Sequence, residues 1–116
     1  MKYKDPVTGE WKDLYVGAPV DVIVDNSSDY TIDNLIGNKS YKLGTLTTLT
    51  ITDCAVFDKE SIIYFNSGDT ATTVNLPTVL THLGDVPELT EGTGVCEANT
   101  NYIVSILNRI CVWKAY

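Results

Sequence analysis

The chain contains one histidine, His82, and any Ser-His-Asp or Cys-His catalytic arrangement would have to use it. This histidine stands in a turn-rich connection, and the chain has neither a GxSxG nucleophile motif nor an HExxH zinc motif. Gly92 and Gly94 are spaced like part of a nucleotide-binding loop, but the third glycine and the lysine are missing, so we expect a turn or bulge there. We therefore predict a rim or surface histidine, no catalytic residues and no enzymatic activity.

Aspartates recur every four residues between positions 21 and 33. In a strand-turn-strand, Asp25, Ser27 and Asp29 would offer oxygens to one loop, and Ca²⁺ prefers such ligands. The segment lacks the glycine and the terminal glutamate of an EF-hand loop. The sequence does not decide against a calcium-binding loop, but it favours the interpretation that these aspartates are solubilising charges, which protect exposed strand edges. We predict no bound metal and no other cofactor.

The three cysteines are Cys54, Cys96 and Cys111, an odd number whose spacing matches neither a CxxC pair nor a zinc pattern. Free cysteine is among the most buried residue types, so we predict three free thiols in the core. The N-terminal segment has no apolar stretch of the signal-peptide kind. We therefore expect synthesis in a reducing cytoplasm without a signal peptide.

The composition limits the classes of partner. The chain has 116 residues and a mass of 12.7 kDa, enough for one ordinary domain. Its net charge is −7 and Arg109 is its only arginine, so neither nucleic acid nor an anionic membrane is an expected partner. No stretch approaches the roughly 18 apolar residues needed to span a bilayer.

The chain from Val16 onward has the composition of β-strands. Threonine, valine and isoleucine dominate it, and glycine, proline, asparagine and aspartate interrupt them at short intervals. We expect one all-β domain over residues 16–116, an antiparallel β-sandwich (jelly-roll-like) or a flattened barrel. The one helical candidate, 79–83, is about a single turn long. The predicted strands are residues 20–24, 29–33, 40–44, 46–52, 60–66, 72–76, 101–107 and 109–115.

Period-2 alternation predicts which side chains face the core. Within 62–65 both faces are equally apolar, so the pattern leaves the inward face open there. The last two strands should form a hairpin that turns at Asn108. The predicted inward set is Val22, Val24, Leu49, Ile51, Ile63, Phe65, Val74, Leu76, Tyr102, Val104, Ile106 and Val112.

Residues 1–15 differ from the rest of the chain. Their charges sum to zero and no strand or helix period runs through them. We predict an N-terminal arm, or attachment segment, that the domain does not need in order to fold. Trp113 and Tyr116 are also candidates for sealing the core. The candidate interface or glycan contacts are Tyr3, Trp11, Tyr15, Tyr30, Trp113 and Tyr116.

The opening sequence, MKYKDPVTGEWKDLYV, resembles the leader of small structural proteins encoded by phages and prophages of gut Gram-positive bacteria, where an MKY-DP-TGE leader precedes a β domain. Residues 63–77 (IYFNSGDTATTVNLP) resemble the hairpin pattern of these proteins, and residues 97–108 (EANTNYIVSILN) resemble the segment before their last strand. The likeness covers the leader and roughly 60–116. The chain departs from the pattern by having no tryptophan in 78–84 and no Asn-Gly at its last turn.

The resemblance implies a virion component such as a tail-fibre, baseplate or head-fibre module, and it carries over no catalytic residues. On this hypothesis the protein is a homo-oligomer, with a trimer favoured, that assembles with other virion proteins. Its location would be the virion. The alternative hypothesis is a carbohydrate-binding β-sandwich that holds a host-surface glycan on exposed aromatic side chains.

Overall fold

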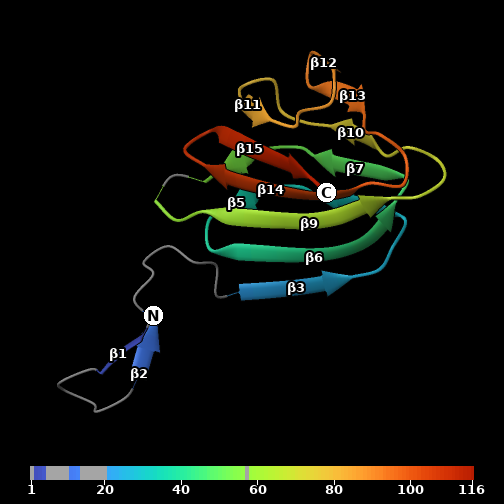
Figure 1. Cartoon of the computed structure of the whole chain (residues 1–116). Coiled ribbons are helices and arrows are strands. Elements are labelled where there is room, and N and C mark those ends of the chain that lie inside the picture. The colour runs from blue at the N-terminus through green and yellow to red at the C-terminus, as the bar shows by residue number, and fades with distance from the viewer. Residues whose placement is uncertain (1, 5–10, 14–20, 57) are drawn as a thin grey trace.

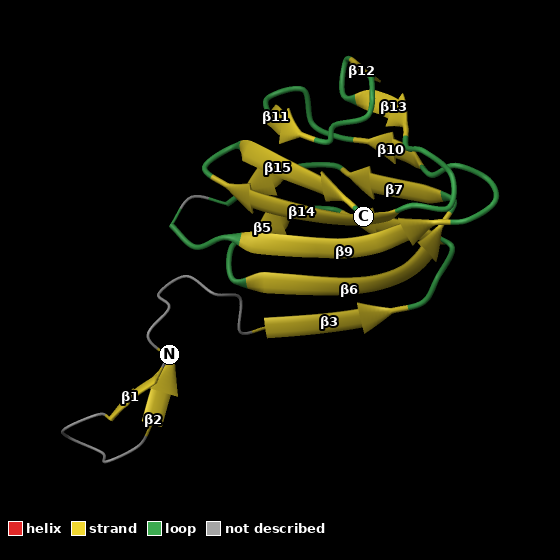
Figure 2. Ribbon diagram, viewed as in Figure 1, coloured by secondary structure: helices red, strands yellow, loops and turns green. Residues whose placement is uncertain are grey.

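The computed structural model describes residues 2–4, 11–13, 21–56 and 58–116. This part of the chain contains strands and loops and no helix, so the predicted all-β fold is confirmed (Figure 2). The strands are β1 (Lys2–Lys4), β2 (Trp11–Asp13), β3 (Asp21–Asp25), β4 (Asp29–Ile32), β5 (Leu35–Ile36), β6 (Lys39–Leu46), β7 (Thr48–Ile51), β8 (Cys54–Ala55), β9 (Ser61–Ser67), β10 (Thr73–Asn75), β11 (Thr81–Gly84), β12 (Leu89–Thr90), β13 (Thr93–Val95), β14 (Asn101–Leu107) and β15 (Ile110–Ala115).

Two sheets make up most of the domain (Figure 1). The six-stranded sheet has the order β11-β15-β14-β9-β6-β3, and the five-stranded sheet has the order β12-β13-β10-β7-β4. Strands β5 and β8 form a small third sheet, and β1 pairs with β2. The core contains residues from both large sheets, as expected of a sandwich.

Strand direction is where the structure departs from an antiparallel sandwich. Strand β6 pairs in parallel with both β3 and β9, and β7 pairs in parallel with both β4 and β10. The chain reaches these pairings because each connection passes through a strand of another sheet before it returns, as a parallel crossover requires. The first half of the domain is therefore wound as stacked coils, coil 1 being β3, β4 and β5 and coil 2 being β6, β7 and β8.

The C-terminal part closes the stack with antiparallel strands. The predicted hairpin is β14 and β15, and its two turn residues, Asn108 and Arg109, have φ of 52° and 64°. Asparagine tolerates this left-handed region well, which is why the turn forms without glycine. The single helical turn considered for residues 79–83 does not form. Most of these residues belong to β11, which begins at Thr81 and pairs in parallel with β15.

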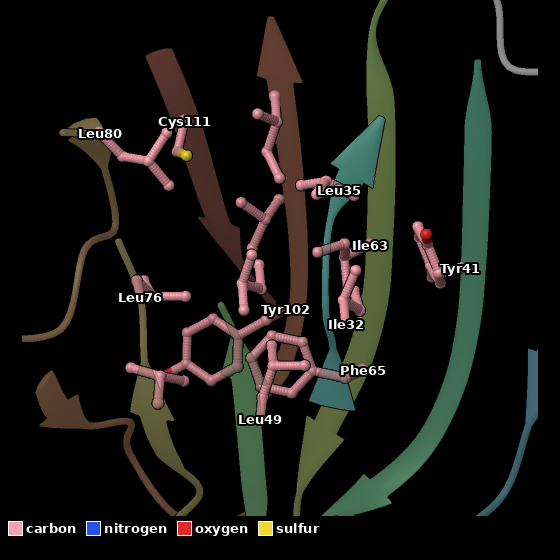
Figure 3. Close-up of a cluster of buried hydrophobic side chains, with 14 of the residues drawn as sticks. Ile32, Leu35, Tyr41, Leu49, Ile63, Phe65, Leu76, Leu80, Tyr102 and Cys111 are labelled. Atoms are coloured by element: carbon pink, nitrogen blue, oxygen red, sulfur yellow. The ribbon is translucent and has the colours of Figure 1, made fainter. Parts of the chain in front are cut away.

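The core confirms most of the predicted inward set (Figure 3). Ile63 and Phe65 point inward, which settles the face that the sequence left open. The Phe65 and Tyr102 rings stack with centroids 5.2 Å apart. The confirmed members are Leu49, Ile51, Ile63, Phe65, Val74, Leu76, Tyr102, Val104 and Ile106.

The prediction was wrong for Val22, Val24 and Val112, which are exposed at 50%, 68% and 48%. Each valine has an apolar residue directly next to it in its strand, and that neighbour takes the inward position. For Val112 the inward neighbours are Cys111 and Trp113, both buried. A run of adjacent apolar residues therefore hides which of the two faces is the core.

The N-terminal segment contains two short strands where no strand pattern was evident. Strands β1 and β2 pair antiparallel, with Tyr3 opposite Lys12. Figure 1 draws this hairpin apart from the two large sheets. The side chains of Tyr3 and Trp11, and the whole of Tyr15, lie outside the described part of the structure.

Shortening a buried ring in the core should destabilise the domain strongly. We expect Phe65→Ala to lower the free energy of unfolding by about 3–5 kcal/mol, because it removes a ring packed between Tyr102 and Trp113. Val112→Ala, on the exposed side of the same sheet, should cost less than about 1 kcal/mol in the monomer. Urea unfolding at low protein concentration measures both, and equal costs would show that the faces are assigned wrongly.

Candidate functional site

The outward side of the six-stranded sheet carries six of the ten exposed large hydrophobic residues among the described residues. The term outer face is used below for the outward-pointing positions of this sheet, in strands β3, β6, β9, β14, β15 and β11. These positions alternate along each strand with more buried neighbours. Nine of these positions are apolar, and six of the nine are classed as exposed. They are Val22, Val24, Ile62, Tyr64, Leu83, Ile103, Leu107, Ile110 and Val112.

Backbone register arranges these side chains in rows across the sheet. One row includes Ile62, which lies beside Ser105, and Val112, which lies beside both Ser105 and Leu83. The next row places Tyr64 beside Ile103. Side chains directly opposite each other on neighbouring strands touch, so the rows form one continuous surface.

The outer face lacks the negative charge that dominates the rest of the chain. None of its outward strand positions carries aspartate or glutamate, while two carry lysine, Lys42 and Lys114. The nearest carboxylate is Glu60, just before β9, which accepts a 2.7 Å hydrogen bond from the Ser105 hydroxyl. A chain with net charge −7 therefore keeps one broad surface nearly free of acid.

The outward side of the five-stranded sheet is built differently. It is mostly polar, with Val95 as an exposed apolar exception, and its threonine and asparagine side chains bond to one another across the strands. Asn75 donates to the Thr50 hydroxyl at 3.4 Å and accepts from the Thr93 hydroxyl at 3.3 Å. A polar outward face beside an apolar inward face is the usual pattern of a sheet with one solvated side. The apolar outer face of the other sheet breaks that pattern.

The aromatic residues singled out from the sequence do not gather on one surface. Trp113 takes the core-sealing role, with 2% exposure and ring contacts to Phe65 and Tyr102. Tyr30 is half-buried and packs edge-on against Tyr41 at 6.2 Å. Tyr116 is 64% exposed.

His82 lies on β11 with its ring turned toward the core, and not on a loop as expected. Its Nδ1 accepts a 3.0 Å hydrogen bond from Trp113 Nε1, and burial lowers the pKa of the imidazole below its usual value. The neutral ring is thus the form that the bond requires, because a protonated Nδ1 has no lone pair to accept with. This arrangement gives His82 a structural partner in the core.

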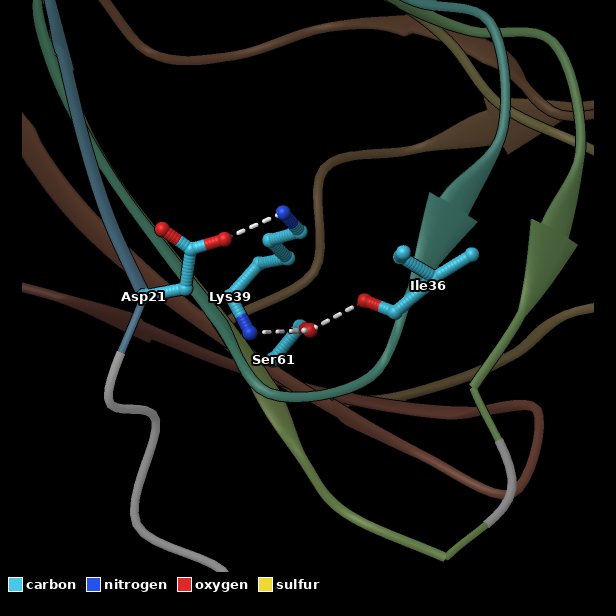
Figure 4. A network of polar contacts seen from close by, with 4 residues as sticks. All are labelled: Asp21, Ile36, Lys39 and Ser61. Atoms are coloured by element: carbon cyan, nitrogen blue, oxygen red, sulfur yellow. Dashed lines mark hydrogen bonds and ion pairs between the residues drawn. The ribbon is translucent and has the colours of Figure 1, made fainter.

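Two aspartates of coil 1, Asp21 and Asp25, have local partners. The Asp25 carboxylate accepts the Ser27 backbone N–H at 2.7 Å, and hydrogen bonding from the Ser27 side chain, together with this backbone bond, lowers the pKa of Asp25. Asp21 pairs with Lys39 of the next coil (Figure 4). Among the described residues no group of three or more histidine, cysteine or acidic side chains is arranged to hold a metal ion. The structure therefore adds no support for a calcium-binding loop at Asp25, Ser27 and Asp29.

The three cysteines are free and buried, as predicted. Burial raises the pKa of Cys96 to about 11 and that of Cys111 to about 12, and it also raises the pKa of Cys54. Thiolate is the reactive form of cysteine, so these thiols are poor nucleophiles near neutral pH.

A hollow of about 440 Å³ lies beside the C-terminal strands. Three of its lining residues are acidic, Asp85, Glu88 and Glu97. The Asp85 carboxylate accepts the Ala115 N–H at 3.0 Å, and the Tyr102 hydroxyl accepts the Glu97 N–H at 3.0 Å. These bonds hold the chain together at this point and form no nucleophile–base pair of the kind that catalysis uses.

Comparison with protein-family models, curated proteins and solved structures finds no match to this chain. In the part of the chain that the structure describes, no helix is long and apolar enough to cross a membrane. The function must therefore be inferred from the surfaces of the domain. The outer face, which alternation alone did not assign, is the surface that most needs an explanation.

The buried thiols give a direct check of the core. Titration of the denatured, unreduced protein should find three thiols per chain. The native protein at about pH 8 should react much more slowly, because buried groups with raised pKa carry little thiolate. One reactive thiol in the denatured protein would mean a disulfide, and fast reaction in the native protein would mean that the cysteines are accessible.

The histidine predicts a specific pH dependence of stability. Its pKa is lower in the folded state than the unfolded value of about 6.5, so its contribution is complete above that pH. The contribution is lost as the pH falls from about 6.5 toward the folded pKa, because the unfolded state then binds more protons. Unfolding by urea at about pH 7.5 and 5.5 should show a smaller loss for His82→Gln than for the wild type. An equal loss would contradict this role.

Proposed function

We propose that this protein is a non-enzymatic structural module that assembles with copies of itself through the outer face. The observation that supports this most directly is the apolar outward side of the six-stranded sheet. Strands that are apolar on both sides are typical of sheets covered on both sides. Within the described chain only the inward side has a cover, since the core lies there.

Charge favours a second copy as the cover. Two chains of net charge −7 repel each other, and repulsion is weakest where both surfaces lack acid. The outer face comes near to this, because its outward strand positions carry two lysines and no carboxylate, and the neighbouring Glu60 carboxylate is bonded to Ser105. Large exposed apolar patches on soluble proteins commonly mark interfaces of this kind.

We further propose that the module belongs to a phage virion, as a fibre, baseplate or head-fibre part, and that its assembly is a homo-oligomer such as a trimer. The support for the virion is the resemblance of the N-terminal leader and of residues 60–116 to phage structural proteins. The carbohydrate-binding alternative has less support, because Trp113 is buried and Tyr30 packs on Tyr41 and not in an exposed platform.

A lysine placed in the outer face should break this assembly. We expect light scattering to give the wild type a multiple of 12.7 kDa and to give Val112→Lys a mass near 12.7 kDa, since the interface would bury an unpaired charge. Val79→Lys is the matched control, because Val79 is similarly exposed (56%) but lies outside the strands. Its mass should stay that of the wild type.

A wild-type mass of 12.7 kDa at every concentration would overturn the proposal. So would an unchanged mass for Val112→Lys. Circular dichroism of both variants tests that each remains folded, so that loss of mass is not mistaken for unfolding.

A further inference from the structure

Coil 1 ends the stack with unpaired strand edges. Strands β3 and β4 stand last in their sheets, and β5 pairs only with β8, so among the described residues each strand of coil 1 has a neighbour on one side alone. A free edge presents backbone N–H and C=O groups that can pair with a further strand. In Figure 1 this edge lies along β3, at the opposite side of the sheet from β11.

This edge is acidic. Residues 21–38 contain four aspartates and no lysine or arginine, which is more than half of the net charge of −7. Asp21 and Asp25 stand at the two ends of β3, and only Asp21 is paired with a lysine of coil 2. Lys39 Nζ pairs with Asp21, and the Lys39 backbone N–H donates to the Ser61 hydroxyl, which in turn donates to Ile36 O (Figure 4). These bonds connect β3 and β5 of coil 1 to the strands that follow.

The N-terminal segment has the complementary pattern. Strand β1 reads Lys-Tyr-Lys, and β3 reads Asp-Val-Ile-Val-Asp. Alternation separates the two lysines from Tyr3 in the β1 sequence, as it separates Asp21 and Asp25 from Val22 and Val24 in β3. A register that aligns one lysine position with one aspartate position also aligns position 3 with Val22 or Val24, on the outer face.

The β1–β2 hairpin also needs support. Its strands have three residues each, and an isolated two-stranded hairpin is marginal in water. We propose that β1 of one copy docks as an added strand on the β3 edge of a second copy. This inference rests on the proposed self-assembly and names the segment and the edge that make the contact.

A double-mutant cycle in the full chain tests the contact. Lys2→Gln with Lys4→Gln removes the positive charge of β1, and Asp21→Asn with Asp25→Asn removes the negative charge of the edge while keeping side chains that can form the same turns. Analytical ultracentrifugation gives the association constant of the wild type, of each pair and of the combination. We expect each pair to weaken association about tenfold, and the combination to weaken it no further than about the same tenfold.

Lys59→Gln is the control, because Lys59 follows coil 2 and lies outside both strands. Combined with the edge variant, it should give additive effects. Raising the salt concentration from about 0.05 M to about 0.5 M should lower the association constant of the wild type relative to that of the combined variant, because both proteins keep the same net charge of −7 and only the wild type has the attraction to lose.

Additive effects of the lysine and aspartate pairs would overturn the docking, even if the protein is an oligomer. An unchanged association constant for Lys2→Gln with Lys4→Gln would overturn it as well. Loss of stability at constant mass for Lys2→Gln with Lys4→Gln would mean that β1 docks on its own chain, which also contradicts the proposal. A wild type that stays monomeric would overturn both the docking and the proposed function, whereas Val112→Lys tests the outer face alone.

Discussion

The parallel register between successive coils is the constraint on which the rest of the structure depends. Tyr41 of β6 lies beside Ile23 of β3 and Ile63 of β9, and this alignment turns all three toward the core. Because side chains alternate along a strand, a slip by one residue would exchange the core and the outer face. Buried hydroxyls hold the alignment: Ser61 donates to Ile36 O and Thr72 donates to Leu46 O, both at 2.6 Å.

The same register gives the two large sheets different outward sides. Strands β7 and β10 of the five-stranded sheet alternate threonine or asparagine with leucine, isoleucine or valine, so the outward positions of these two strands are polar. Strands β9 and β14 instead have consecutive apolar residues, such as Ile62 and Ile63, so both sides are apolar. The difference lies in the sequence and not in the pairing. It points to water on one sheet and to a further layer of protein on the other.

Period-2 patterning was sufficient to locate the long strands, the C-terminal hairpin and most of the core. It failed for the outer face, because a strand with apolar residues on both sides gives no sign of which side is inward. It also missed strands of two residues, such as β5, which are too short to show alternation. The coils are visible in the sequence only as a weak repeat: Thr31-Ile32 recurs nineteen residues later as Thr50-Ile51, which lies in the neighbouring strand.

Parallel direction was missed for a related reason. A hairpin reveals its direction through its turn, whereas the partner of β3 comes eighteen residues later in the chain, as the pairing of Val22 with Ser40 shows. The coiled winding in turn leaves coil 1 with open edges, which an antiparallel barrel would have closed. Aspartates at those edges disfavour pairing with acidic or apolar strands. A strand that carries lysine can pair there, because its charge is opposite to that of the edge. A contact between an arm and an edge joins different surfaces, so copies linked in this way close into a ring where the rotation allows it.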